Sequence, residues 1–401
     1  MWRLAAALLM VAAVAWSGPD EVQHAWDLVT QGRRAEAIDL LRGLTKAEPG
    51  NVEAHLLLGS LLQEAGEREE CLKQLTAAVS LRPDSAEAQN ALGEAYNAFG
   101  DGKSAREGFE KAVKLDARLA PARVNLGAVL LDAGEVGAAA KELDAAIGLL
   151  GDKDEAAYPL YLRAKIYAGS GEARKAEAAL ERAVKLQPGF AEAWSDLGAV
   201  RQAMTDSGGA IAALRRAVEL KPDDGVAQRR LGMEYLDEGK AAEALPHLRA
   251  AARVNPRDQG ALNGLQRGLR ETGQDAEADR VKAQLVEMLR ARDRADQNTV
   301  AALRLNNEGA ELEKAGKLGA AIEKYRAAHQ LAPGHNGIEV NLAVALLRNG
   351  EWEEGLKLLR EAAARQPEDA ALKAALEDAL DQAPVRYGGR GKARGAPGGP
   401  K

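Results

Sequence analysis

The sequence predicts an all-α protein: a solenoid of ten stacked helix hairpins closed by a C-terminal capping helix. Three observations lead to this prediction. Proline recurs with a step of 34 residues within three groups along the chain, and a Leu-Gly pair recurs on the same frame. The composition, 46% apolar but only 4% aromatic, suits helices packed through small side chains rather than one large aromatic core.

Each repeated unit has the pattern of two helices joined by a tight turn. The Leu-Gly pair lies in a first amphipathic helix with apolar residues at i, i+1 and i+4, and a later glycine such as Gly66 ends it. A second apolar set at i, i+4 and i+7 marks the partner helix, which the proline ends. One hairpin cannot bury both apolar faces, so neighbouring hairpins must stack. The pairs are Leu58-Gly59, Leu92-Gly93, Leu126-Gly127, Leu197-Gly198 and Leu231-Gly232.

The 34-residue frame divides the chain into two blocks of repeats. The ten units start near residues 18, 52, 86, 120, 157, 191, 225, 259, 302 and 336. Units one to eight are expected to occupy 18–292, and units nine and ten 296–367. Between them the sequence predicts an over-long second helix over Asp275–Arg294, and residues 368–383 should form the capping helix.

Unit eight carries three glycines at four-residue intervals in its first helix: Gly260, Gly264 and Gly268. Each glycine costs about 1 kcal/mol relative to alanine in a helix interior. Two interpretations remain open, a loosened hinge at this unit or simple tolerance in a well-packed stack.

The two ends of the chain differ from the repeats. Residues 1–15 resemble a signal peptide, with Arg3, an apolar run and Ala13-Val14-Ala15 at the expected cleavage site. The run is shorter than the about 20 residues that span a bilayer, although an uncleaved anchor is the alternative. We therefore expect an exported protein, periplasmic or secreted. Residues 384–401 are rich in Gly and Pro and basic, and are expected to be disordered.

In this register the chain resembles the tetratricopeptide repeat (TPR) family. Unit six carries the family pattern at Trp194, Leu197, Gly198, Ala210, Leu214, Ala217 and Pro222. The resemblance implies a right-handed superhelix with a concave groove lined by first-helix residues. It also implies an interaction scaffold, of an exported bacterial type given residues 1–15.

Residues at the groove-facing positions of units five, seven and eight form the candidate peptide-binding site. Arginine forks pair with carboxylates, and Tyr and Met supply adaptable apolar contact, so this set favours an extended, possibly acidic peptide. The alternative is a solvated inner face with chance charges. The candidates are Tyr158, Tyr161, Lys165, Arg229, Met233, Asn263, Arg267 and Arg270.

The sequence contains no catalytic motif. It has no phosphate-binding loop and no zinc-protease helix, and the single cysteine, Cys71, excludes an intramolecular disulfide. A net charge of −6 disfavours a dedicated nucleic-acid binder. We therefore expect no enzymatic activity, no cofactor and no metal.

The function predicted from the sequence is a protein- or peptide-binding scaffold in the cell envelope or exported space. Two alternatives remain: a structural subunit or assembly cofactor of an envelope complex, and an accessory regulator of a glycan or cell-wall enzyme.

Overall fold

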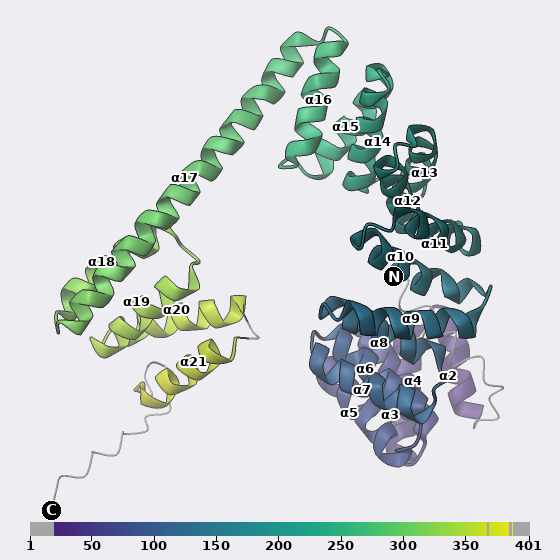
Figure 1. Ribbon diagram of the computed structural model, residues 1–401. Helices are drawn as coiled ribbons and strands as arrows, with labels where there is room; N and C mark the ends of the chain where they lie inside the picture. The colour runs from purple at the N-terminus through teal and green to yellow at the C-terminus, as the bar shows by residue number, and fades with distance from the viewer. Residues whose placement is uncertain (1–19, 367–368, 385–386, 388–401) are drawn as a thin grey trace, which may run out of the picture. The chain divides into compact units, whose positions relative to one another are not determined.

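The computed structural model describes residues 20–366, 369–384 and 387, which form twenty α-helices and one short 3-10 helix but no strand (Figure 1). Consecutive helices pack as hairpins, which confirms the predicted all-α stack. The predicted signal peptide, residues 1–15, and most of the predicted tail, 384–401, lie outside the described residues. Among the described helices, none has both the length and the apolar character needed to cross a lipid bilayer.

The helices of the first eight units alternate between first and second members of each hairpin. Their bounds are α2 (Asp20–Thr30), α3 (Arg34–Ala47), α4 (Val52–Ala65), α5 (Arg68–Leu81), α6 (Ala86–Ala98), α7 (Gly102–Leu115), α8 (Ala120–Asp132), α9 (Val136–Leu150), η1 (Asp154–Ala156), α10 (Ala157–Gly169), α11 (Ala173–Leu186), α12 (Ala191–Ala203), α13 (Ser207–Leu220), α14 (Gly225–Asp237), α15 (Ala241–Val254) and α16 (Gln259–Glu271). The predicted starts of units two to eight coincide with the first residues of these first helices.

The remaining helices are α17 (Asp275–Lys314), α18 (Leu318–Leu331), α19 (Asn336–Arg348), α20 (Trp352–Arg365) and α21 (Ala370–Gln382). The chain divides into two compact parts, each larger than a repeat unit: residues 1–275 and residues 276–401. The predicted over-long helix, 275–294, in fact continues to Lys314 and includes the first helix of unit nine. The boundary expected between 292 and 296 therefore falls inside α17. Neither Gly nor Pro occurs from residue 274 to residue 308, so nothing in this stretch interrupts the helix.

The Leu-Gly glycine lets the two helices of a hairpin approach closely. In unit six, a Cβ built on Gly198 would lie 2.5 Å from Leu214 Cγ, which is closer than two non-bonded carbon atoms approach in proteins. In unit three the same position, Gly93, would place its Cβ 2.7 Å from Phe109 Cε1. The glycine that ends the first helix has another role, because Gly66 has a φ of 76°, which other residues adopt only with strain.

The three glycines of α16 are also packing residues. A Cβ on Gly264 would lie 2.7 Å from Met233 Sδ, and one on Gly268 would lie 3.2 Å from Leu245 Cδ2. The absent side chains thus make room for α14 and α15. This packing favours tolerance in a tight stack over a loosened hinge.

Unit nine begins with a polar face where internal repeats are apolar. In α12, the third and seventh residues of the unit are Ala193 and Leu197, and both are buried. In α17 the same places hold Arg304 and Glu308, and the Arg304 side chain is 83% exposed. The first described helix, α2, likewise has an exposed residue, His24, at the seventh place. Residues 302–314 therefore have the sequence of a helix that starts an array.

Candidate functional site

Three of the predicted site residues come together on α10. Tyr158, Tyr161 and Lys165 lie one helical turn apart and line a pocket of about 480 Å³ between α8 and α10. The rest of the lining was not predicted: three of its residues come from α8, and their place depends on how α8 lies against α10. These residues are Ala128, Leu131, Asp132 and Leu162.

The two tyrosines form a supported aromatic surface. Their ring centroids are 6.4 Å apart, and the Tyr161 ring lies 5.0 Å from that of Phe190. Lys165 Nζ lies 5.7 Å from the Tyr161 centroid, a cation–π distance. Burial and the neighbouring Asp196 carboxylate raise the pKa of Tyr161, whose hydroxyl bonds to that carboxylate. Tyr161 is therefore a neutral, fixed part of the pocket wall.

The predicted arginines are engaged in ion pairs within the protein. Arg229 Nε donates to Asp258 Oδ2 at 3.0 Å, which links α14 to the start of α16. Arg267 and Arg270, both on α16, also have acidic partners at 2.7–2.8 Å. These three arginines therefore do not form the free cationic surface that the sequence suggested. The pairs are Arg229–Asp258, Arg267–Asp237, Arg267–Glu271 and Arg270–Asp275.

The last two candidates lie apart from the pocket residues. Met233 is half-buried on α14, where its sulfur faces Gly264, so part of its surface serves packing. Asn263 on α16 is exposed. Neither residue lines the tyrosine pocket.

A recurring contact between neighbouring first helices was not predicted. Four pairs, each 35 residues apart, join the fifth residue of one unit to the sixth of the next. A search for polar or aromatic residues at this spacing would have found them. The pairs are Asn90–Asn125 (3.1 Å), Tyr161–Asp196, Ser195–Arg230 (3.4 Å) and Asn306–Asn341 (2.9 Å).

Glu94 lies at the first of these contacts. Its Oε1 accepts hydrogen bonds from Asn90 Nδ2 at 2.9 Å and from Asn125 Nδ2 at 2.8 Å. Burial raises the pKa of this carboxyl, and the two amides oppose the rise. The folded state thus binds this proton more tightly than the unfolded chain does.

Glu94→Gln is expected to stabilise the protein at neutral pH. The wild-type contribution is fully present below the ordinary pKa of 4.5 and is lost as pH rises through the raised value. Glutamine keeps both hydrogen bonds through its oxygen but carries no charge. Urea unfolding should show the variant gaining on wild type as pH rises from 4.5 to 7, whereas the exposed control Glu107→Gln should not. A constant difference at every pH would contradict this account.

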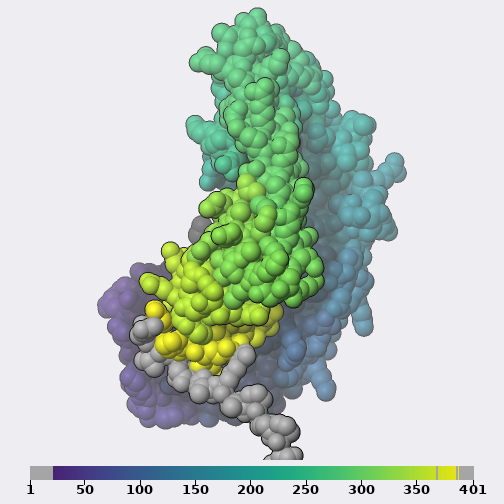
Figure 2. Space-filling view, turned by 90° about the vertical axis from the view of Figure 1, so that its left-hand side faces the viewer, coloured from purple at the N-terminus to yellow at the C-terminus, as the bar shows by residue number. Residues whose placement is uncertain are grey.

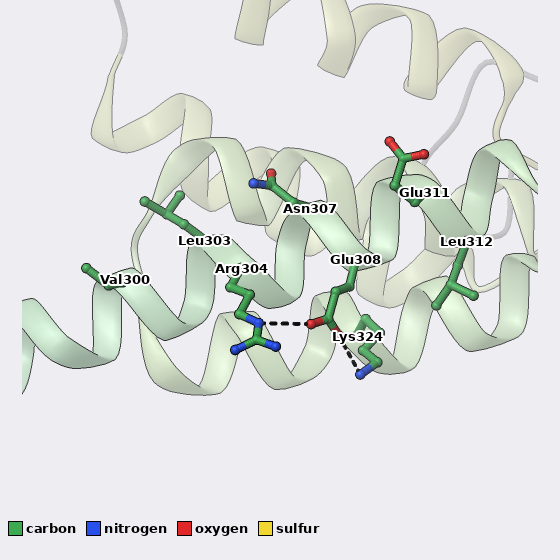
Figure 3. A pocket seen from close by; sticks show the side chains of 8 residues that line it. All are labelled: Val300, Leu303, Arg304, Asn307, Glu308, Glu311, Leu312 and Lys324. Carbon is green, nitrogen blue, oxygen red and sulfur yellow. Dashed lines mark hydrogen bonds and ion pairs between the residues drawn. The ribbon is translucent and has the colours of Figure 1, made fainter.

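A second pocket, of about 810 Å³, lies along α17 in the unit of residues 276–401 (Figure 3). Glu308 bridges its charged side, contacting Arg304 at 3.3 Å and Lys324 at 2.8 Å. Within the described residues, no group of three His, Cys, Asp or Glu side chains is placed to hold a metal ion. The lining residues are Val300, Leu303, Arg304, Asn307, Glu308, Glu311, Leu312 and Lys324.

Comparison with solved structures agrees with the fold. A chain of the APC/C hetero-tetramer Cut9–Hcn1 is 17% identical with a TM-score of 0.53, over 66% of this chain and 52% of that one, so this chain spans about half of that relative. PilF of Pseudomonas aeruginosa is 17% identical (TM-score 0.49), with 53% and 95% coverage. YrrB, described as a TPR protein with an unusual peptide-binding site, is 20% identical (0.40), with 47% and 96% coverage.

The matches to family profiles together cover more than half of the chain. Two tetratricopeptide repeat profiles match, one at residues 28–95 and 312–379 and the other at 161–225 and 229–278. No curated protein matches the chain significantly. The repeat register, the hairpin packing and these matches together show that the chain belongs to the tetratricopeptide repeat family.

Proposed function

We propose that this chain is a non-enzymatic scaffold that binds an extended peptide segment of a partner protein at the pocket between α8 and α10. TPR proteins bind proteins or peptides, and the chain has the fold for it. The observation that carries the proposal is the paired Tyr158 and Tyr161 surface facing a pocket of about 480 Å³. Its volume is within the range of ligand-binding pockets, and its lining combines apolar side chains with the polar groups of the tyrosines, Asp132 and Lys165.

The chemistry of the lining favours a ligand anchored by an apolar or aromatic side chain. Tyrosine rings supply rigid contact area at low entropic cost, and aromatic pairs gain about 0.5–1.5 kcal/mol beyond area burial. Asp132 and Lys165 carry opposite charges at the rim. The arginines that suggested an acidic ligand already have internal partners, so binding should depend only weakly on salt.

Residues 1–15 lead us to propose that this scaffold acts in the exported space, periplasmic or secreted. The intact mass of protein recovered from the envelope fraction tests this. A mass lower by that of residues 1–15 would support export with cleavage, and a full-length cytoplasmic protein would contradict it.

The pocket is tested by filling it. Peptides selected from a random display library on the wild-type protein would be measured against Ala128→Arg, which places a long side chain in the pocket. We expect affinity to fall at least about tenfold, or about 1.4 kcal/mol. Ala199→Arg is the matched control, because Ala199 holds the same place in unit six and does not line the pocket.

Equal affinity of both variants for the selected peptides would place the ligand elsewhere. A steep loss of affinity between 50 and 500 mM salt, on the order of tenfold, would restore the acidic-ligand hypothesis.

A further inference from the structure

A carboxylate lies one helix away from the tyrosine pocket, in the neighbouring unit of the same stack. Glu94 takes the ninth, groove-facing place of unit three on α6, and its Oε1 accepts from Asn125 Nδ2 on α8 at 2.8 Å. Asn125 precedes the pocket residue Ala128 by three residues, so their side chains share one face of α8. In Figure 2 the colour passes from blue to teal without a gap, because successive hairpins stack directly on one another. The carboxylate and the pocket therefore belong to one stretch of the groove.

One of the two oxygens of this carboxylate is unused. The amides of Asn90 and Asn125 both donate to Oε1, at 2.9 and 2.8 Å. Within the described residues, Oε2 accepts no hydrogen bond, and this atom is not fully buried. No base in the same part of the chain forms an ion pair with Glu94. Oε2 can therefore accept a hydrogen bond from a ligand that enters the groove.

The groove around Glu94 is acidic. The groove-facing places of units two to four hold five acids and no Lys, Arg or His. Arg82 and Arg34 pair with two of these acids, and the other three have no ion pair within the described residues. The next groove-facing base along the chain is Lys165 in unit five, which lies over the Tyr161 ring. The five acids are Glu53, Glu64, Glu87, Glu94 and Asp132.

The ionised form of Glu94 costs the free protein stability. Burial raises the pKa of this carboxyl, which means that the folded chain holds the charged form less well than water does. A partly buried charge without a counter-charge is typical of binding sites, where the ligand supplies the opposite charge. The chemistry that would complete this site is a cation that also donates hydrogen bonds.

We propose that Glu94 binds a lysine or arginine of the peptide whose apolar or aromatic side chain occupies the pocket between α8 and α10. The ligand class rests on the proposed function and narrows it to a peptide with a base close to its apolar anchor. Packed helices lie about 8–10 Å apart, and an extended chain rises about 3.3 Å per residue. The base therefore stands about two to four residues from the anchor. Because the contact is partly buried, salt screens it little, in keeping with the weak salt dependence expected above.

A double-mutant cycle between protein and peptide tests the contact. Peptides selected from the random display library on the full-length wild-type protein would be made with both ends capped, once with the base and once with glutamine in its place. We expect Glu94→Gln to lose about tenfold in affinity for the basic peptide and almost nothing for the glutamine peptide. Glu107→Gln removes the same charge from an exposed place on α7 and should bind the basic peptide as wild type does. Glu94→Gln is expected to be the more stable protein at neutral pH, so its loss of affinity would not reflect unfolding.

The pH dependence of binding is an independent measurement of the same contact. The raised pKa keeps part of Glu94 protonated above pH 4.5 in the free protein, whereas a bound cation favours the ionised form. Binding therefore releases a proton, and the affinity of wild type for a basic peptide without histidine should rise from pH 4.5 to 7.5. The affinity of Glu94→Gln should stay nearly constant. The other groove-facing acids of α4, α6 and α8, namely Glu53, Glu64, Glu87 and Asp132, are the same in both proteins and cancel in this comparison.

The outcomes separate this contact from the pocket itself. Selected peptides without a base near their anchor, or equal losses of the basic and glutamine peptides on Glu94→Gln, would overturn the contact. If affinity also falls on Ala128→Arg, the pocket stands without it. Binding that survives Ala128→Arg but keeps its coupling to Glu94 would overturn the pocket and support the contact.

Discussion

Phe109→Ala is expected to lower the free energy of unfolding by about 3–5 kcal/mol, because it empties the core of unit three. Phe109 lies on α7 and is only 1% exposed. Its ring packs against Gly93 of α6, which has no side chain that could move into the space left by the ring. The gap left by alanine cannot close, because α6 and α7 are also held by the hairpins on either side.

Phe109→Leu separates volume from chemistry. Leucine occupies the same place in seven other units, at Leu41, Leu75, Leu143, Leu180, Leu214, Leu248 and Leu359. We therefore expect a loss of less than about 1.5 kcal/mol for this variant. Because repeat arrays can unfold in parts, urea unfolding should be accompanied by hydrogen exchange of α6 and α7. Equal losses for the two variants would show that an aromatic ring, not volume, is required.

The helix boundaries of repeat units two to eight could be predicted because the sequence signal for each boundary is local and recurs along the chain. The Leu-Gly pair and the turn glycine recur from unit to unit. The boundaries of a unit that lacks the pair, such as unit five, therefore follow from the register of its neighbours. The length of α17 was not predicted, because the 34-residue frame was given more weight than the absence of helix breakers before Gly309. Periodicity shows where a helix can start, but only a breaker makes the preceding helix stop.

The site could be predicted only in part, for a related reason. Tyr158, Tyr161 and Lys165 share one face of one helix, so sequence spacing alone brought them together. Arg229 and Arg267 were chosen for their own charge, but their partners Asp258 and Asp237 lie 29 and 30 residues away on neighbouring hairpins. A position in the repeat specifies which way a side chain faces. It does not specify whether the adjacent repeat already supplies the opposite charge.

Arg201→Ala is the second substitution with a large expected effect. Arg201 takes the place on its first helix where Leu62 and Leu130 stand in other units, and its side chain is only 19% exposed. It donates to Glu177 at 2.9 Å and also pairs with Glu181, both on the preceding helix α11. Removing it leaves two like charges one turn apart, one of them half-buried. We expect a loss of about 1–3 kcal/mol, less than for a fully buried pair because Glu181 is half exposed.

The triple variant Arg201→Leu/Glu177→Gln/Glu181→Gln shows which part of that loss is electrostatic. A leucine restores the apolar contact seen in other units, and the glutamines remove the uncompensated charges. If the arginine serves to neutralise the glutamates, the triple variant should recover most of the wild-type free energy of unfolding. If Arg201→Leu alone recovers as much, the arginine acts through packing and the ion pairs add little.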